Sequence, residues 1–99
     1  NDDWAIGALS VCAEEGVRVP RDIAVTGFDN APIGAYAVPP LTPFAQDYPA
    51  MAAKAVEILL KYIRAGKMPG PRASVFKLPG KLVIRHSCGA VSRPSSGMA

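Results

Sequence analysis

The feature that most constrains the fold is the segment from Asp22 to Phe28 (DIAVTGF), a short apolar run without clean alternation of polar and apolar residues. A strand of a parallel sheet is covered on both faces, and it therefore reads as a nearly continuous apolar run. The segment predicts a central parallel strand and, with it, an α/β fold. It ends in Gly27-Phe28-Asp29-Asn30, and ligands of open α/β sheets bind beyond the carboxyl ends of strands. We therefore expect a binding site at this turn.

Two longer segments predict helices that would flank the sheet. Between Asp3 and Glu15, apolar residues recur at the spacing of one helical face. Asn1 or Asp2 can cap the start of this helix, and Gly16 can close its end. The apolar stripe consists of Ala5, Ala8, Leu9, Cys12 and Ala13.

The second predicted helix runs from Asp47, which caps its start, to Ala65, and Gly66 ends it. Glu57 and Lys61 stand at the favourable i, i+4 offset for an ion pair. The polar stripe is Lys54, Glu57, Lys61 and Arg64, and the opposite side carries Met51, Ala55, Leu59, Tyr62 and Ile63.

The remaining segments are shorter, and Pro and Gly punctuate them. Pro39-Pro40 limits residues 31–38 to one or two helical turns, and residues 41–46 are predicted to be extended. Residues 67–72 are predicted to form a loop, 74–78 and 81–85 two short strands separated by Pro79-Gly80, and 87–99 a disordered tail.

Charge and length exclude several classes of protein. The net charge of +3 arises from 11 Lys and Arg against 8 Asp and Glu without a basic run, which does not argue for nucleic-acid binding by these residues. No apolar run approaches the roughly 20 residues that span a bilayer, and no signal peptide is visible. The sequence opens at Asn1 without an initiator Met and runs directly into a predicted helix, so we expect a piece of a longer protein.

No enzyme, metal or cofactor motif stands out. The sequence has no Gly-x-Ser-x-Gly elbow and no Gly-rich phosphate loop, and we expect a protein that is not an enzyme and needs no cofactor. His86 has no Cys or acidic partner at metal-ligand spacing. Cys12 and Cys88 lack the spacing of a disulfide framework or a zinc site, which favours a reducing, cytoplasmic location.

A series of short motifs follows in order along residues 1 to 86. They are ND-x-x-AIGA from Asn1, GVRVPRDI from Gly16, VTGFDN from Val25, PPLT from Pro39, QD from Gln46 and LVIR from Leu82. In this order and at this spacing they resemble the Lac repressor (LacI/GalR) family of bacterial transcription regulators.

The resemblance implies a two-lobed fold like that of periplasmic binding proteins, with parallel sheets flanked by helices and a ligand between the lobes. Residues 1–86 would be the C-terminal part of the effector-binding and dimerisation domain. Within it, 1–41 would belong to the C-terminal lobe, 42–78 to the N-terminal lobe, and 81–86 to a strand that returns to the C-terminal lobe. The DNA-binding helix-turn-helix of such a regulator would precede Asn1.

The resemblance also implies which side chains bind the effector. Asn1 and Asp29 are similar to polar residues of the family's cleft, and Gln46 is similar to a residue of the crossover that faces the cleft. Amide and carboxylate groups match sugar hydroxyls or ring N–H groups. On the residues alone, Asn1 reads more readily as a helix cap, and Asp29 and Asn30 read as turn residues. The resemblance favours a binding role for Asn1 and Asp29, whereas Asn30 stays a turn residue.

We also expect a homodimer interface that includes the first predicted helix. Ile6 points about 100° away from Ala5 on the predicted helix, where a solvated helix normally carries a polar side chain. The resemblance places Ile6, Ser10 and Ala37 between subunits, and we favour an interface role for Trp4 as well. Ile6 can alternatively pack within its own lobe.

Together these expectations describe a regulator that couples a small effector, a sugar or related metabolite, to its affinity for operator DNA. The alternative is a periplasmic sugar-binding protein of the same fold. Upstream sequence separates the two, because a helix-turn-helix would precede the first and a signal peptide the second.

Overall fold

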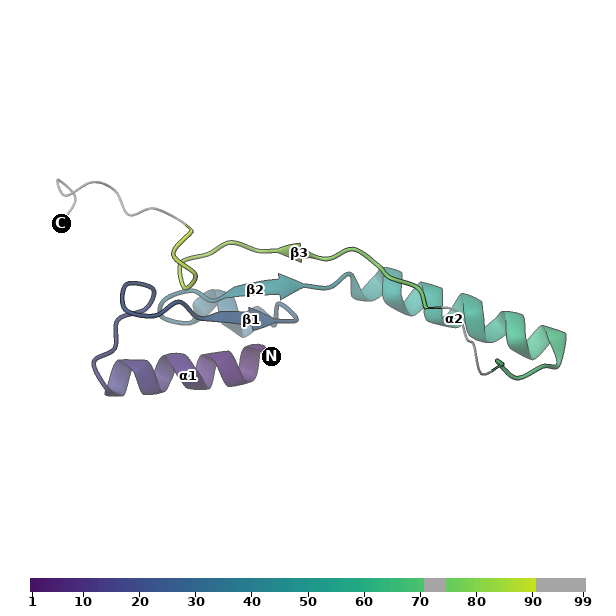
Figure 1. The fold of residues 1–99 in the computed structure, drawn as a ribbon, viewed down its shortest axis with the longest axis horizontal. Coiled ribbons are helices and arrows are strands. Elements are labelled where there is room, and N and C mark those ends of the chain that lie inside the picture. The colour runs from purple at the N-terminus through teal and green to yellow at the C-terminus, as the bar shows by residue number, and fades with distance from the viewer. Residues whose placement is uncertain (71–74, 91–99) are drawn as a thin grey trace. The chain divides into compact units, whose positions relative to one another are not determined.

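In a computed structural model the chain is described over residues 1–70 and 75–90 (Figure 1). It divides into two compact units. The first comprises Asn1–Ala45 and Lys81–Ala99, and the second comprises Gln46–Gly80.

The first unit begins with helix α1 (Asp2–Glu14). The side chain of Asn1 caps it, as the sequence predicted, by accepting a hydrogen bond from the backbone N–H of Trp4 at 3.1 Å. Gly16 follows with a φ of 70°, a left-handed conformation that glycine adopts without strain, and Val17 N–H then bonds the carbonyl of Cys12 at 2.8 Å.

Helix α1 buries a narrower face than its apolar stripe predicted. Ala5 and Leu9 are buried and form a cluster with Leu41, whereas Ala8 and Ala13 are exposed. Burial of a leucine side chain contributes roughly 1.5 to 3 kcal/mol, so Leu9 and Leu41 account for much of what holds α1 in place. Ile6, Val19, Val25 and Ala37 pack against this cluster while partly exposed.

The sheet of the first unit has three strands in the order β1-β2-β3. Strand β1 (Thr26–Phe28) runs parallel to β2 (Thr42–Ala45), and β2 runs antiparallel to β3 (Lys81–Leu82). The sheet is therefore mixed, and β1 lies at its edge where the sequence predicted a central strand.

The connection from β1 to β2 contains the 3-10 helix η1 (Pro32–Tyr36), in the segment where one or two helical turns were predicted. Gly34 of η1 is buried, and its carbonyl accepts a hydrogen bond from Leu41 N–H at 2.9 Å. An added Cβ at Gly34 would be 3.5 Å from Leu41, an ordinary packing distance, so η1 lies close against the residue that precedes β2.

The chain after β3 is ordered further than the sequence predicted. Ser87, where the disordered tail was expected to start, is fully buried. Its hydroxyl accepts a hydrogen bond from Thr42 N–H at 2.8 Å and donates one to the carbonyl of Val25. Ser87 thereby joins the residue before β1 to the first residue of β2, although the three residues lie far apart in the sequence. Residues 91–99 of the predicted tail lie outside the described residues.

The second unit is dominated by helix α2 (Tyr48–Ala65). Asp47 caps it by accepting from Ala50 N–H at 3.0 Å, and Gly66 ends it with a φ of 64°, so its predicted limits are confirmed. None of its residues is buried. Glu57 pairs with Lys54 at 3.4 Å, where the sequence had suggested Lys61 as its partner.

The segment after α2 forms no strand over residues 75–78, and Ser74 of that predicted strand lies outside the described ranges. Lys54 instead places its ammonium 4.6 Å from the ring centre of Phe76. The predicted 67–72 loop is irregular over its described part, to Gly70. Among residues 1–70 and 75–90, neither helix combines the length and apolar character that a membrane crossing requires.

Candidate functional site

The carboxyl end of β1 is the place where polar side chains from several elements of the first unit meet. Helix α1 runs antiparallel to β1, so its first residue lies at this end of the strand (Figure 1). A hydrogen bond from Ala31 N–H to the Asp2 carboxylate joins the start of α1 to the turn that follows β1. Asn1 and Asp29, two of the predicted binding residues, therefore lie at the same end of the unit.

The turn at this end has an unusual backbone. Asp29 and Asn30 both have positive φ angles, 108° and 65°, and they are the two non-glycine residues with positive φ in the described part of the chain. Asn and Asp are the residues that tolerate this region best, yet each such conformation costs on the order of 1 to 3 kcal/mol unless its surroundings impose it. Asp29 N–H donates to the carbonyl of Phe44 on β2 at 2.9 Å, which extends the strand pairing to Asp29. The backbone of Asn30 is that of a turn residue, as predicted.

Asn1 is exposed and caps α1. The capping bond uses its side-chain oxygen, and its amide nitrogen carries two N–H donors in addition. The helix-capping interpretation is therefore confirmed, and it is compatible with a second role in which the amide donates to a ligand.

Asp2 is the residue that sequence reasoning missed, because it was considered only as a cap. Its side chain is 2% exposed. One carboxylate oxygen accepts from Ala31 N–H, and within the described residues the other oxygen has no hydrogen-bond partner. That second oxygen lies against Gly27, where an added Cβ would stand 2.0 Å from it. The helical spacing of apolar residues gives no sign that a carboxylate will be buried. The position of Asp2 in the first turn of α1 is nevertheless favourable for a negative charge, because the helix dipole is positive at that end.

Arg85 was also missed. It follows β3 and is partly buried. Its guanidinium donates to the carbonyl of Leu41 at 3.0 Å and to the side-chain oxygen of Asn30 at 3.1 Å. In the sequence, Arg85 was noted only as the last residue of the LVIR motif and of a predicted strand.

Two aromatic rings lie beside the turn. Phe28 and Phe44 are register partners on β1 and β2, and their rings stack with centres 5.5 Å apart at 17°. They remain 45% and 37% exposed. Exposed aromatic faces at the end of a sheet can pack against the apolar face of a ring-shaped ligand.

Gln46, the third predicted binding residue, directly follows β2 and is the first residue of the second unit. It is partly buried. The structure thus places Asn1 and Asp29 together in one unit and Gln46 at the start of the other.

The predicted interface residues all belong to the first unit. Ser10 is exposed on α1, whereas Ile6 and Ala37 are partly buried against the cluster of Ala5, Leu9 and Leu41. Trp4 is 83% exposed. Ile6 and Ala37 therefore contribute to their own unit's packing, and the surface they still expose is what a second subunit could cover.

Three titratable groups of the first unit have displaced pKa values, and one is Arg18, whose guanidinium pKa is raised by its pairing with Asp22. Arg18 binds Asp22 through two side-chain contacts of 2.8 and 2.9 Å, and this lowers the pKa of the Asp22 carboxyl to about 2. A hydrogen bond with Thr42 lowers the pKa of the Cys88 thiol. The described residues hold no group of three metal-ligating side chains.

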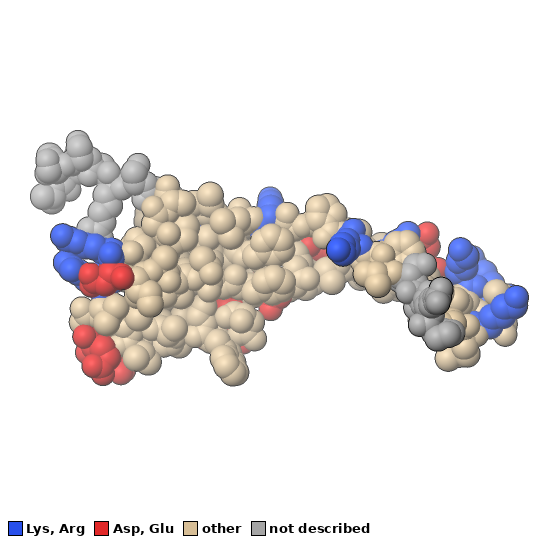
Figure 2. Space-filling model, viewed as in Figure 1, with Lys and Arg blue, Asp and Glu red and all other residues tan. Residues whose placement is uncertain are grey.

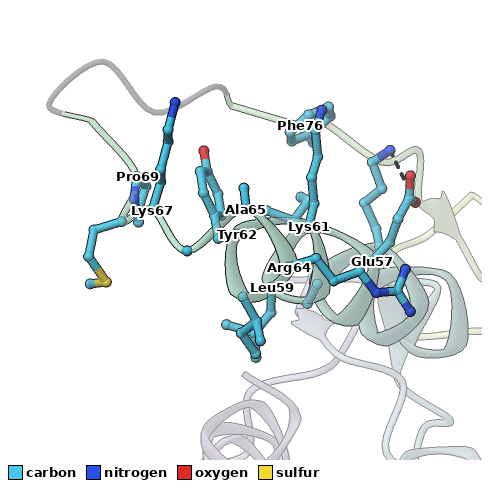
Figure 3. A pocket seen from close by; sticks show the side chains of 15 residues that line it. Glu57, Leu59, Lys61, Tyr62, Arg64, Ala65, Lys67, Pro69 and Phe76 are labelled. Carbon is cyan, nitrogen blue, oxygen red and sulfur yellow. Dashed lines mark hydrogen bonds and ion pairs between the residues drawn. The ribbon is translucent and has the colours of Figure 1, made fainter.

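The second unit has a hollow of its own between the C-terminal half of α2 and Phe76. Figure 3 shows Tyr62, Lys61 and Phe76 around it, with the ion pair of Lys54 and Glu57 nearby. Blue Lys and Arg side chains gather near the end of α2, the part of the chain that carries Lys61, Arg64 and Lys67 (Figure 2). This hollow lacks the strand-end setting at which ligands of α/β sheets bind, so it is a weaker candidate for the effector site than the turn after β1.

Comparison with known proteins gives consistent results. Residues 1–88 match the family model of the periplasmic binding protein-like domain. Over 87 residues the chain is 39% identical to the HTH-type transcriptional regulator MalR of Streptomyces coelicolor and 44% identical to the HTH-type transcriptional repressor PurR of Aliivibrio salmonicida. The match covers 88% of this chain but 24% and 25% of those proteins, so the chain spans about a quarter of their length.

Solved structures of similar fold agree. The Lac repressor dimer bound to operator and the anti-inducer ONPF superposes with a TM-score of 0.74 and 33% identity, over 89% of this chain and 29% of that one. A LacI family regulator from Arthrobacter sp. FB24 in complex with lactose gives a TM-score of 0.70 and 36% identity, over 85% and 32%. A LacI-type regulator from Bacillus cereus gives 0.72 and 26%, over 84% and 28%.

Proposed function

Because the chain belongs to the periplasmic binding protein-like domain family, in the form carried by LacI-type transcriptional regulators, we propose that it is the C-terminal part of a regulator's effector-binding domain. The effector is a sugar or sugar-like metabolite, and the regulator couples its binding to affinity for operator DNA. A helix-turn-helix N-terminal to this chain contacts the DNA. The regulator is a cytoplasmic homodimer without enzymatic activity, metal or cofactor.

The observation that carries this proposal is the placement of Asp29. Asp29 directly follows β1, a strand paired in parallel with β2, and lies at the end of the unit where α1 begins. Its neighbour in sequence, Phe28, stacks on Phe44, and both rings are partly exposed. A carboxylate and aromatic faces at one strand end suit sugars, whose hydroxyls donate hydrogen bonds and whose C–H faces pack on rings. Lactose in the complex of the similar Arthrobacter regulator supports this class of ligand.

The function requires two arrangements of the lobes with different affinities for DNA. An effector changes DNA affinity only by the difference between its binding to the two arrangements, typically about 1 to 3 kcal/mol of coupling. We propose that Asn1 and Asp29 bind from the first unit and Gln46 from the crossover into the second. The first unit then corresponds to the C-terminal lobe and the second unit to the N-terminal lobe, so the lobe boundary expected at residue 42 is proposed to lie at Gln46, because residues 42–45 pair within the first unit.

A periplasmic sugar-binding protein is the less favoured alternative, because the relatives similar in sequence are named as transcriptional regulators.

The test is Asp29→Asn in the intact regulator that carries this chain. Asparagine tolerates the positive φ of this position, whereas alanine would strain the turn as well as remove the charge. Loss of a charge-assisted hydrogen bond costs about 1.5 to 3 kcal/mol, so the effector should bind at least about tenfold more weakly while operator binding without effector persists. Effector titrations of operator release measure this.

Asp3→Asn is the matched control, since Asp3 is an exposed carboxylate of α1. Its titration should follow the parent. An Asp29→Asn variant that responds to effector like the parent would remove Asp29 from the site.

A further inference from the structure

The turn that carries Asp29 is bonded by a side chain from a distant part of the sequence. Arg85 follows Asn30 by 55 residues and reaches the turn from the segment after β3. Its guanidinium donates to the side-chain oxygen of Asn30 at 3.1 Å and to the carbonyl of Leu41 at 3.0 Å. Its backbone N–H donates to the Thr42 hydroxyl at 2.9 Å. Arg85 therefore bridges the turn and the start of β2.

We propose that Arg85 is a positioning residue of the effector site, which acts through Asn30 to hold the Asp29 carboxylate in its binding orientation. The chemistry fits because a guanidinium is planar, always charged and rich in donors, and can therefore satisfy two acceptors at fixed angles. A carboxylate on a turn with freedom to rotate would spend only a fraction of its time in the orientation that binds.

The backbone of the turn shows why it needs such support. Asp29 and Asn30 both have positive φ angles, which Asp and Asn tolerate better than other L-residues but which still cost free energy unless the surroundings stabilise them. Asp29 is held by its N–H bond to Phe44, and Ala31 is held by its N–H bond to Asp2. Arg85 supplies the corresponding bond to the side chain of Asn30. These three contacts come from β2, from α1 and from the segment after β3, and together they hold three consecutive residues of the turn.

The guanidinium is itself fixed. The nitrogen that bonds the Leu41 carbonyl lies close to the buried Gly34, where an added Cβ would be 3.9 Å from it, an ordinary packing distance. An arginine whose own position is packed transmits little motion to its partner. The ion pair of Arg18 and Asp22 lacks this property, since the Arg18 side chain is 60% exposed.

The first test needs no ligand. Crystal structures of the intact regulator and of its Arg85→Met variant are compared in one crystal form, because methionine keeps much of the length of the side chain and removes every donor. We expect the turn to lose its double positive φ or to become less ordered than β1. A variant turn with both positive φ angles, as ordered as in the parent, would overturn the proposal.

The second test rests on the proposed function. Lactose and glucose as hydroxyl-rich probes, and guanine as a probe with ring N–H groups, are titrated into the intact regulator, and a probe that binds is carried to the variants. Arg85→Met should weaken that probe by about tenfold, and Asn30→Gly should weaken it while keeping a residue that accepts positive φ. The double variant should lose no more than Arg85→Met alone, because both changes remove the same bond.

Controls separate positioning from folding. Arg18→Met removes an arginine from the same unit but away from the turn, and its probe affinity should equal that of the parent. A merely structural role would lower the melting temperature of Arg85→Met and leave its probe affinity unchanged, which would contradict the proposal. If Arg85→Met does not fold, Asn30→Gly alone decides, since it leaves the bond from Arg85 to Leu41 intact. If the parent binds guanine and neither sugar, the proposed effector class is wrong; if it binds none of the three, the ligand-free comparison still decides the role of Arg85.

Discussion

At the scale of single residues, the buried carboxylate of Asp2 dictates what can stand opposite it. Asp2 is nearly inaccessible to solvent and lies against the backbone of Gly27 on β1. A Cβ at Gly27 would stand 2.0 Å from the Asp2 oxygen and 2.9 Å from Leu41, so glycine is needed here for space and not for backbone freedom. The glycine of the VTGF segment is therefore required because the side chain of Asp2, at the start of α1, occupies the space beside it.

Gly27→Ala in the intact regulator should be destabilising by about 1 to 3 kcal/mol, because an added methyl group must displace a buried carboxylate. Urea denaturation of parent and variant measures the change. Gly7→Ala is the matched control, since a Cβ there meets nothing within 4 Å and alanine favours a helix interior. Gly7→Ala should be neutral or stabilising by up to about 1 kcal/mol, and equal stability of Gly27→Ala and the parent would show that Asp2 moves aside freely.

The candidate site could be predicted in part from single residues. The position of Asp29 after a strand, and of Asn1 at a helix start, followed from local patterns. Asp2 and Arg85 did not, because their partners, Ala31 and Asn30, lie 29 and 55 residues away in the sequence. A pattern that runs along the chain contains no information about which distant backbone groups a side chain will meet.

At the scale of elements, the helices were predicted more accurately than the strands. The limits of α2 agree with the sequence because its two caps, Asp47 and Gly66, act within one turn of the helix ends. Strand limits depend on partners instead. The strand predicted from Asp22 to Phe28 is observed only as β1, from Thr26 to Phe28. Val25, which precedes β1, donates its N–H to the carbonyl of Ser87 and not to a neighbouring strand.

The caps of α2 satisfy backbone groups at its two ends through local contacts, so their effect does not depend on what covers the sides of the helix. Asp47→Ala should lower the stability of the helix by about 1 kcal/mol, because the N–H of Ala50 loses its acceptor. Circular dichroism during thermal unfolding of the intact regulator measures the loss. Asp47→Asn should retain most of the stability, since asparagine caps as well as aspartate; a variant with alanine that melts like the parent would mean that packing, and not the cap, fixes the start of α2.

At the scale of the whole molecule, the proposed homodimer can be tested more cleanly at Ser10 than at Ile6. Ile6 packs partly against its own unit, so a charge there would disturb folding and association together. Ser10 is an exposed residue of the same helix. In a two-fold interface each residue of this surface recurs in the partner, so one substitution introduces two like charges.

Ser10→Glu should therefore raise the dimer dissociation constant of the intact regulator by at least about tenfold. The thermal melting of the protein, measured at concentrations where it is monomeric, should stay unchanged. Sedimentation over a range of protein concentrations measures the dimer dissociation constant. Arg21→Glu is the control, because it makes a larger change of charge at an exposed loop position. If both variants dimerise like the parent, α1 does not form the subunit interface.

The pairing of β2 with β3 has a topological consequence. Ala45 and Lys81, the residues where the chain leaves the first unit and returns to it, are direct antiparallel partners. The whole second unit is thus spliced between two neighbouring positions of one strand ladder. A two-residue Asn-Gly turn could join those positions as a β-hairpin without altering the strand order. The second unit is therefore an insertion in the sequence of the first, and the pairing of Ala45 with Lys81 sets the register of β2 and β3 independently of the length of that insertion.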